Sequence, residues 1–194
     1  MLFDRLRALP PDELTDRRVR LEYLAETHRE GLREACAADP DIWAELYPYS
    51  MLGVHFDRWW THEIAGPRIL FAILHDNQVV GTTSYLNIAA ADATIEIGGT
   101  YLAPDVRGTG LNDAMKRLLL AAAFADGARR VELRVDAINQ RSRRAVTKLG
   151  GHLDGILRAH RITWTGRLRD TCVFSILADE WPAVRDRLDT ILRG

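Results

Sequence analysis

Segments with the hydrophobic periodicity of strands and segments with that of helices follow one another along the chain. Short apolar runs, or strict alternation of apolar and polar residues, predict strands at 17–24, 69–74, 78–88, 94–102, 130–137, 152–164 and 168–177. Apolar residues spaced by three or four predict helices at 27–38, 41–46, 56–64, about 110–126 and 139–149, and a closing helix after Asp179. This order of elements predicts a mixed α/β (α+β) fold with a largely antiparallel sheet.

The helix at 110–126 divides most clearly into two faces. Its apolar face holds Leu111, Met115, Leu118, Leu119 and Ala122. Its polar face holds Asn112, Asp113, Lys116 and Arg117. We expect the apolar face to pack on the sheet and the polar face to point away from it.

A loop with Pro104, Gly108 and Gly110 joins strand 94–102 to this helix. Free backbone N–H groups and the positive end of the helix dipole converge at such a helix start, which makes it a site for phosphate. Arg107 adds a cation whose fork suits phosphate oxygens. The alternative interpretation is a tight turn in which the glycines serve only the backbone angles.

Size and composition narrow the class of protein. The chain has 194 residues and a formal net charge of −1, so it has no general attraction to nucleic acid or to an anionic membrane. The N-terminus lacks a signal-peptide run, no stretch is apolar enough to cross a membrane, and Cys36 and Cys172 are isolated, which together predict a cytoplasmic protein. We expect an N-terminal extension at 1–16 followed by a single domain at 17–194.

The order of elements resembles that of the GNAT N-acetyltransferase superfamily. Its acetyl-CoA signature is Gln or Arg, two free positions, Gly, one free position, and Gly or Ala. Arg107 and Gly110 occupy the first two places, whereas Asn112 departs from the last. The segments RGTGLNDAMKRLLL, NQRSRRAVTKLGGHLDGILR, GRLRDTCVFSIL and the late Asp-Glu-Trp-Pro resemble the branch that includes ribosomal-protein alanine N-acetyltransferases. The resemblance covers roughly residues 17–192 and implies a GNAT-type sheet with helices on both faces.

The resemblance implies acetyl-CoA as co-substrate and gives roles to particular residues. The expected cofactor-binding residues are Leu102, Arg107, Gly108, Thr109, Gly110, Leu111, Asn112 and Asn139. Asn139 would contact the pantetheine arm, and Ser142 would lie near the thioester sulfur. Both are also favoured residues in the first turn of a helix, so capping is the alternative.

Glu96 is the candidate general base, because it alternates with Ile95 and Ile97 and so lies on the other face of its strand. An ordinary ion pair with an arginine is the alternative. Tyr101 shares the odd positions of Ile95 and Ile97 and is expected to be packed. Neither cysteine lies in the presumed site, and the histidines show no ligand spacing, so we assign no covalent intermediate and no metal.

The acceptor is expected to be a primary amine, either a protein N-terminus or a small molecule. Aromatic residues and His62 fill the segment that lines the acceptor pocket in the superfamily, and we expect one or two of them to face the acceptor. They are Trp43, Tyr47, Tyr49, Phe56, Trp59, Trp60 and His62. A CoA-binding regulatory domain without catalysis remains the second hypothesis. A homodimer is the commonest closed assembly of soluble chains, and the sequence locates no interface for one.

Overall fold

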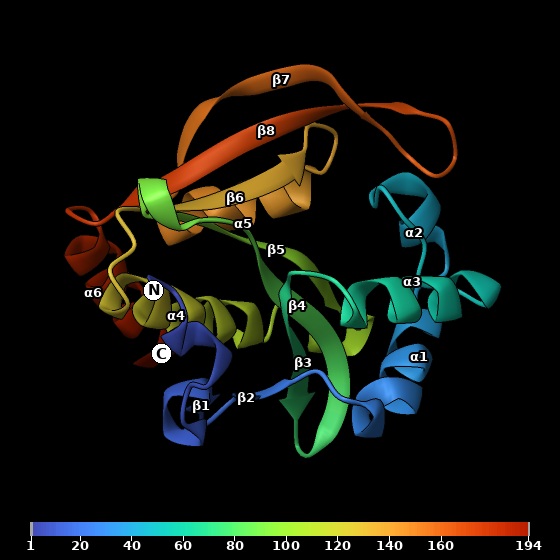
Figure 1. Cartoon of the computed structure of the whole chain (residues 1–194), viewed down its shortest axis with the longest axis horizontal. Helices are drawn as coiled ribbons and strands as arrows, with labels where there is room; N and C mark the ends of the chain where they lie inside the picture. Colours follow the sequence, from blue (N-terminus) through green and yellow to red (C-terminus); the bar gives the residue numbers. More distant parts are fainter. Residues whose placement is uncertain (1, 194) are drawn as a thin grey trace.

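The computed structural model describes residues 2–193, which form one eight-stranded sheet (Figure 1). The strand order is β1-β2-β3-β4-β5-β6-β8-β7, and all neighbours are antiparallel except β5 and β6, which are parallel. The bounds are β1 (Thr15–Asp16), β2 (Val19–Tyr23), β3 (Ile69–His75), β4 (Gln78–Ala89), β5 (Thr94–Leu102), β6 (Arg130–Asp136), β7 (His152–Ile162) and β8 (Leu168–Leu177). The predicted mixed, largely antiparallel sheet is confirmed.

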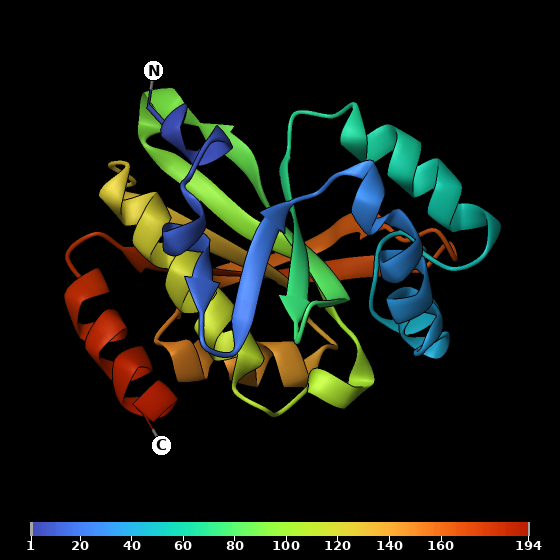
Figure 2. The same cartoon turned by 90° about the horizontal axis from the view of Figure 1, so that it is seen from below.

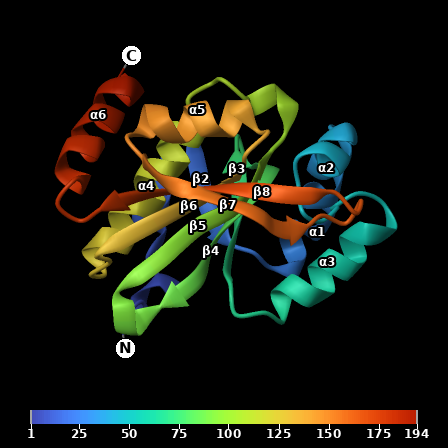
Figure 3. The same ribbon diagram turned by 90° about the horizontal axis from the view of Figure 1, so that it is seen from above.

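Six α-helices lie within the described residues, near the predicted positions. They are α1 (Arg29–Ala37), α2 (Asp41–Glu45), α3 (Val54–Ile64), α4 (Leu111–Ala125), α5 (Gln140–Leu149) and α6 (Trp181–Arg193). Helices α1–α3 gather at one end of the molecule and α6 lies at the other (Figure 2). Seen from above, α4 and α5 lie on the α6 side of the molecule, apart from α1–α3 (Figure 3).

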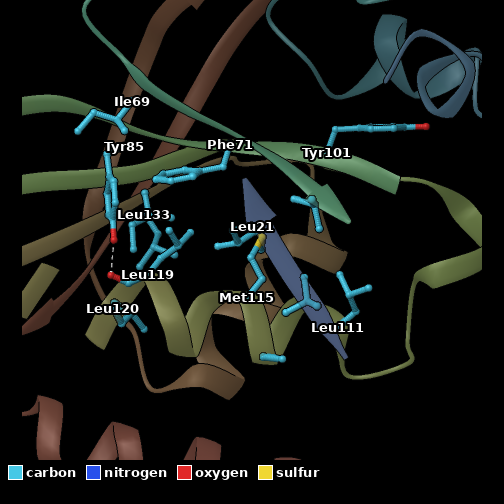
Figure 4. Packing of buried hydrophobic residues seen from close by; sticks show 14 of the residues in the cluster. Leu21, Ile69, Phe71, Tyr85, Tyr101, Leu111, Met115, Leu119, Leu120 and Leu133 are labelled. Atoms are coloured by element: carbon cyan, nitrogen blue, oxygen red, sulfur yellow. Dashed lines mark hydrogen bonds between the residues drawn. The ribbon is translucent and has the colours of Figure 1, made fainter. Parts of the chain in front are cut away.

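Helices cover both faces of the sheet, which we name the α4 face and the α1 face. Tyr85 of β4 points to the α4 face, where its hydroxyl donates to the carbonyl of Leu119 at 2.5 Å (Figure 4). Leu133 and Met115 are buried beside it in the same core. Tyr101 of β5 points to the α1 face and donates to the carbonyl of Ala35 in α1 at 2.7 Å.

Tyr101 is packed as expected, with 1% of its surface exposed, but not on the face of Ile95 and Ile97. The register between β4 and β5 runs from Tyr85–Ile97 to Thr82–Tyr101, so β5 carries one extra residue in between. Such a bulge reverses the alternation of side chains beyond it. Tyr101 therefore shares the α1 face with Glu96.

The segment before residue 17 packs into the same core as the rest of the chain. Phe3, Leu6, Leu9 and Leu14 are each at most 5% exposed. The hydroxyl of Tyr23 donates to the carbonyl of Leu6 at 2.9 Å and accepts from the N–H of Leu9 at 2.6 Å. These contacts join the N-terminal segment to β2.

The hairpin of β7 and β8 forms one edge of the sheet, and its tip, residues 163–167, reaches α2 (Figure 1). Trp164 donates from its indole to the carbonyl of Trp43 at 2.7 Å and from its backbone to the carbonyl of Pro48 at 3.1 Å. Arg167 donates to the carbonyl of Glu45 at 3.1 Å. None of the helices in residues 2–193 is long and apolar enough to span a bilayer.

Candidate active site

Strands β5 and β6 pair over only part of their length. Three register pairs join them, Thr94–Arg130, Ile95–Val131 and Glu96–Glu132, and no further pair follows among the described residues. The bulge in β5 lies in the stretch beyond, where Gly99 has a φ of +60°. The extra residue of a bulge lies outside the hydrogen-bond ladder. A cavity of about 290 Å³ lies at this gap.

The cavity is lined from both faces of the sheet. We call the lining from α4 and α5 the α4 wall; it includes Asn112, Lys116, Asn139 and Ser142. We call the lining on the α1 face the opposite wall; its polar members include Glu96, Arg134, Asp136, His160, Arg161, Arg169 and Thr171. Two molecules could therefore meet in the gap from opposite sides of the sheet.

The loop that leads to the α4 wall has the geometry of an anion site. Gly108 and Gly110 have φ values of +80° and +87°, which explains why glycine stands at both positions. Gly110 is the N-cap of the 15-residue helix α4 and has no side chain to cap the first turn, where the N–H of Leu111 donates to Oγ1 of Thr109 at 3.4 Å. No atom lies within 4 Å of where a Cβ of Gly108 would be, so a ligand has room to approach the backbone.

Arg107 lines the cavity and is fixed by two contacts within the protein. Its Nη1 lies 2.5 Å from Oδ2 of Asp39, and its Nε donates to the carbonyl of Leu102 at 2.8 Å. Its Nη2 is buried and has no hydrogen-bond partner among the described residues. One arm of the guanidinium is thus held in place while another remains available to an anion.

Asn139 is the N-cap of α5, as the alternative interpretation predicted. Its side-chain oxygen accepts from the N–H of Ser142 at 3.0 Å. Both residues also line the cavity. Capping therefore fixes the orientation of Asn139 without removing it from the site.

Lys116 and Asp113 are not on a solvent-facing side of α4, so that expectation is wrong. Lys116 is 6% exposed and donates from Nζ to Oγ1 of Thr100 at 3.0 Å, and no ion pair joins it to another described residue. Burial lowers the pKa of Lys116 to about 7, although the charge of Glu96 acts in the opposite direction. Asp113 is 7% exposed and pairs with Lys148 of α5 at 2.8 Å. Lys116 is buried against β5 at the gap in the sheet, and Asp113 is buried against α5.

Glu96 lies on the opposite wall at the narrow end of the gap and is 5% exposed. One carboxylate oxygen accepts from Nδ2 of Asn87 at 2.6 Å and lies 3.3 Å from Nε of Arg134. Burial raises the pKa of Glu96 above its ordinary value, although these two partners favour the charged form. A buried carboxyl with a raised pKa beside a cavity is suited to accept a proton near neutral pH.

The aromatic segment contributes two residues to the opposite wall, Tyr47 and Tyr49. Burial raises the pKa of Tyr49 to about 12, so its hydroxyl stays protonated. The other aromatic rings of the set are buried in the core, and the His62 side chain is exposed. The core members are Trp43, Phe56, Trp59 and Trp60.

The cavity brings together most of the residues that the sequence singled out. Those that line it are Glu96, Leu102, Arg107, Asn112, Asn139 and Ser142. Gly108, Thr109 and Gly110 form the loop beside it, and Leu111 is buried in the core at 1% exposure, so only its backbone can serve a ligand.

Sequence reasoning missed Lys116, Arg134, Arg161 and Arg169 as members of the site. One signal pointed to Lys116, because the chain uses lysine at only two positions and arginine elsewhere. The arginines carried no comparable signal, since they are spread over a chain rich in this residue.

A sheet that opens between two parallel strands, beside a glycine loop and a helix start, is the architecture of an acyl-CoA-dependent transferase. The GNAT acetyltransferase domain matches residues 18–152, and the chain belongs to this family. Acetyltransferases of this family use acetyl-CoA.

Similar proteins agree with this assignment. An uncharacterized N-acetyltransferase of Mycobacterium tuberculosis is 35% identical over 88 residues, which are 45% of this chain and 55% of that protein. The chain thus spans about half the length of the curated relatives it matches. A GCN5-related N-acetyltransferase from Brucella melitensis has a TM-score of 0.86 at 28% identity, covering 91% of this chain and 83% of that one. Mycobacterium smegmatis RimJ, solved with CoA-disulfide, shares the fold with a TM-score of 0.77 at 21% identity over 90% of each chain.

Proposed function

We propose that this chain transfers an acetyl group from acetyl-CoA to a primary amine by direct attack within a ternary complex. The observation that carries the proposal is the cavity lined from both faces of the sheet, with a glycine loop on one side and a buried carboxyl on the other. Acetyl-CoA supplies the activated thioester. The chain must hold this donor, accept a proton from the amine and stabilise the departing thiolate.

The donor is assigned to the α4 wall. Backbone N–H groups between Gly108 and Asn112 and the unpaired Nη2 of Arg107 would hold the pyrophosphate. Leu102 and Asn139 would contact the pantetheine arm, and Ser142 would donate a hydrogen bond near the sulfur. The glycine N-cap of α4, which offers no side chain of its own, and the open space at Gly108 support this assignment.

Glu96 is assigned the role of general base, which accepts the proton of the amine directly or through water. An α-amine with a pKa of ~8 costs about 1.4 kcal/mol to deprotonate at neutral pH, whereas a lysine at ~10.4 costs about 4.6 kcal/mol. One carboxyl of raised pKa is thus better matched to an α-amine. The resemblance to ribosomal-protein alanine N-acetyltransferases points to the same kind of amine.

A covalent acetyl-cysteine is not part of the proposal. Cys36 and Cys172 are buried and neither lines the cavity. Burial also raises the pKa of Cys36, which disfavours the nucleophilic thiolate.

The test is release of free CoA thiol from acetyl-CoA over a panel of N-terminal peptides, amino acids and aminoglycoside-type amines. We expect turnover with one class, which would identify the acceptor together with the activity. Tight calorimetric binding of acetyl-CoA without turnover on any amine would instead support a non-catalytic CoA-binding domain.

A further inference from the structure

Arg161 of β7 and Arg169 of β8 form a pair on the opposite wall of the cavity. They are register partners, so their side chains leave the same face of the hairpin. Thr171, two residues along β8, lies on the same face and is the register partner of Asp136. Asp136 is two positions from Arg134 on β6, so these two residues also share a face. This arginine pair therefore lies on the α1 face with Glu96. The glycine loop and the start of α4 belong to the other wall, so cofactor phosphate does not account for the pair.

Arg169 is buried with its guanidinium almost unpartnered. Its side chain lines the cavity, and the residue is 8% exposed. It makes no side-chain hydrogen bond to a described residue, and its Nε is fully buried without a partner. The nearest carboxylate oxygen, Oδ2 of Asp136, is 3.6 Å away and is already bound by Nη2 of Arg167 at 2.6 Å. Burying a charged donor without a partner is costly, which indicates a ligand that completes it.

Arg161 is an exposed residue that adds a second positive charge, and this charge acts on Glu96 by lowering its pKa. It has no ion pair and no side-chain hydrogen bond within residues 2–193, and it lines the same cavity. The arginine charges also act on His160. Its pKa is lowered by burial and by the charges of Arg161, Arg134 and Arg169. Arg134 differs from the pair, because Glu96 and Glu132 both contact it.

We propose that Arg161 and Arg169 bind a carboxylate of the acceptor, so that the substrate is an amine that also carries a carboxylate. This inference rests on the proposed acetyl transfer and names its substrate class. The flat fork of arginine suits a carboxylate, and one negative charge matches a pair whose charge Asp136 already offsets in part. Polycationic amines would be repelled by the same wall.

The carboxylate can come from two sources. A free amino acid offers its α-carboxylate, and a peptide offers an acidic side chain next to its N-terminal amine. The experiment below distinguishes the two.

The experiment compares acceptors that differ only in the carboxylate. Thiol release is measured for leucine against leucinamide and for Ala-Asp-amide against Ala-Asn-amide, with rates expressed per concentration of unprotonated amine. We expect kcat/KM to favour the acid at least tenfold in one pair, which also identifies the source of the carboxylate. An acid that is no better than its amide in both pairs would overturn the inference and leave acetyl transfer standing.

Variants connect this preference to the arginine pair. Arg161→Gln should raise KM for the acid more than for the amide and bring the ratio of acid to amide close to one. Arg158→Gln is the matched control, since Arg158 is an exposed arginine of the same strand that does not line the cavity. A preference that survives in both Arg161→Gln and Arg169→Gln would contradict the assignment.

A binding measurement separates this inference from the proposed function. If no amine is acetylated, the proposed function fails, and N-acetylleucine and N-acetylleucinamide are titrated into the protein with CoA. Tighter binding of the acid that is lost in Arg161→Gln would still support the carboxylate site. Equal binding of the two probes would overturn it.

Discussion

The two walls of the cavity are built in different ways. The α4 wall comes from two stretches of chain, residues 102–116 and 139–149, and offers backbone N–H groups, amide and hydroxyl side chains, two arginines and one buried lysine. The opposite wall collects charged residues from β5, β6, β7 and β8 and aromatic residues from the segment after α2. A wall made by local structure keeps the one chemistry proposed for it, the holding of a phosphate. A wall assembled from distant segments can change its charges one at a time, so it is where specificity for the acceptor can vary.

The largest expected effect separates the two walls by function. Glu96→Gln should lower kcat by roughly 10²–10⁴-fold, the usual contribution of a general base, without changing the Kd for acetyl-CoA. The wild-type rate should rise with pH through a pKa above the ordinary glutamate value, since burial raises that pKa. Initial rates from pH 5 to 9 measure both.

Glu132→Gln is the matched control, because Glu132 is the register partner of Glu96 and does not line the cavity. Its kcat should stay within a few-fold of wild type. Unchanged turnover of Glu96→Gln at every pH would show that Glu96 is not the general base.

Lys116 is the buried lysine of the α4 wall, and removing it should stabilise the protein. Lysine titrates near 10.5 when unfolded and at about 7 here, so the folded state binds fewer protons between these values. The wild-type free energy of unfolding should therefore rise with pH across this window. Lys116→Met should gain most at or below pH 7, by about 5 kcal/mol at most, and the gain should shrink toward pH 10.5.

Urea unfolding followed by tryptophan fluorescence at pH 7 and pH 9 tests this expectation. Lys148→Met is the control, since Lys148 is half exposed and pairs with Asp113, so its loss should bring no gain. A Lys116→Met protein that is less stable than wild type at pH 7 would show that the buried ammonium is well compensated.

Arg107 tests the α4 wall itself. Arg107→Ala should weaken acetyl-CoA binding by ~1.5–3 kcal/mol, the scale of a charged hydrogen bond, because no other group replaces the buried Nη2 as a donor to the phosphate. Isothermal titration with acetyl-CoA gives the Kd, and Arg187→Ala, at an exposed site on α6, should match wild type. An unaltered Kd in Arg107→Ala would take this side chain out of the cofactor site.

The sequence predicted the elements and the α4 wall well because both follow local rules. Helical periodicity and the glycines located α4 and its loop, and capping was the alternative interpretation for Asn139 from its position at the start of a helix. Lys116 was misjudged because helical periodicity marks only one face of a helix as packed, whereas the opening between β5 and β6 creates a second buried surface. The arginine pair depends on the register of β7 with β8, and Tyr101 on a one-residue bulge, neither of which a periodic pattern specifies.

The short contact between β5 and β6 would also couple the lifetime of the fold to the supply of the proposed donor. Within residues 2–193, three register pairs join the first five strands to the last three across the sheet, and the proposed donor would occupy the space where the ladder is missing. A ligand that binds only the folded state stabilises it by about 2.7 kcal/mol at a hundredfold excess over its Kd. The supply of acetyl-CoA in the cell would then set how often the two halves of the sheet part and how fast proteases remove the chain.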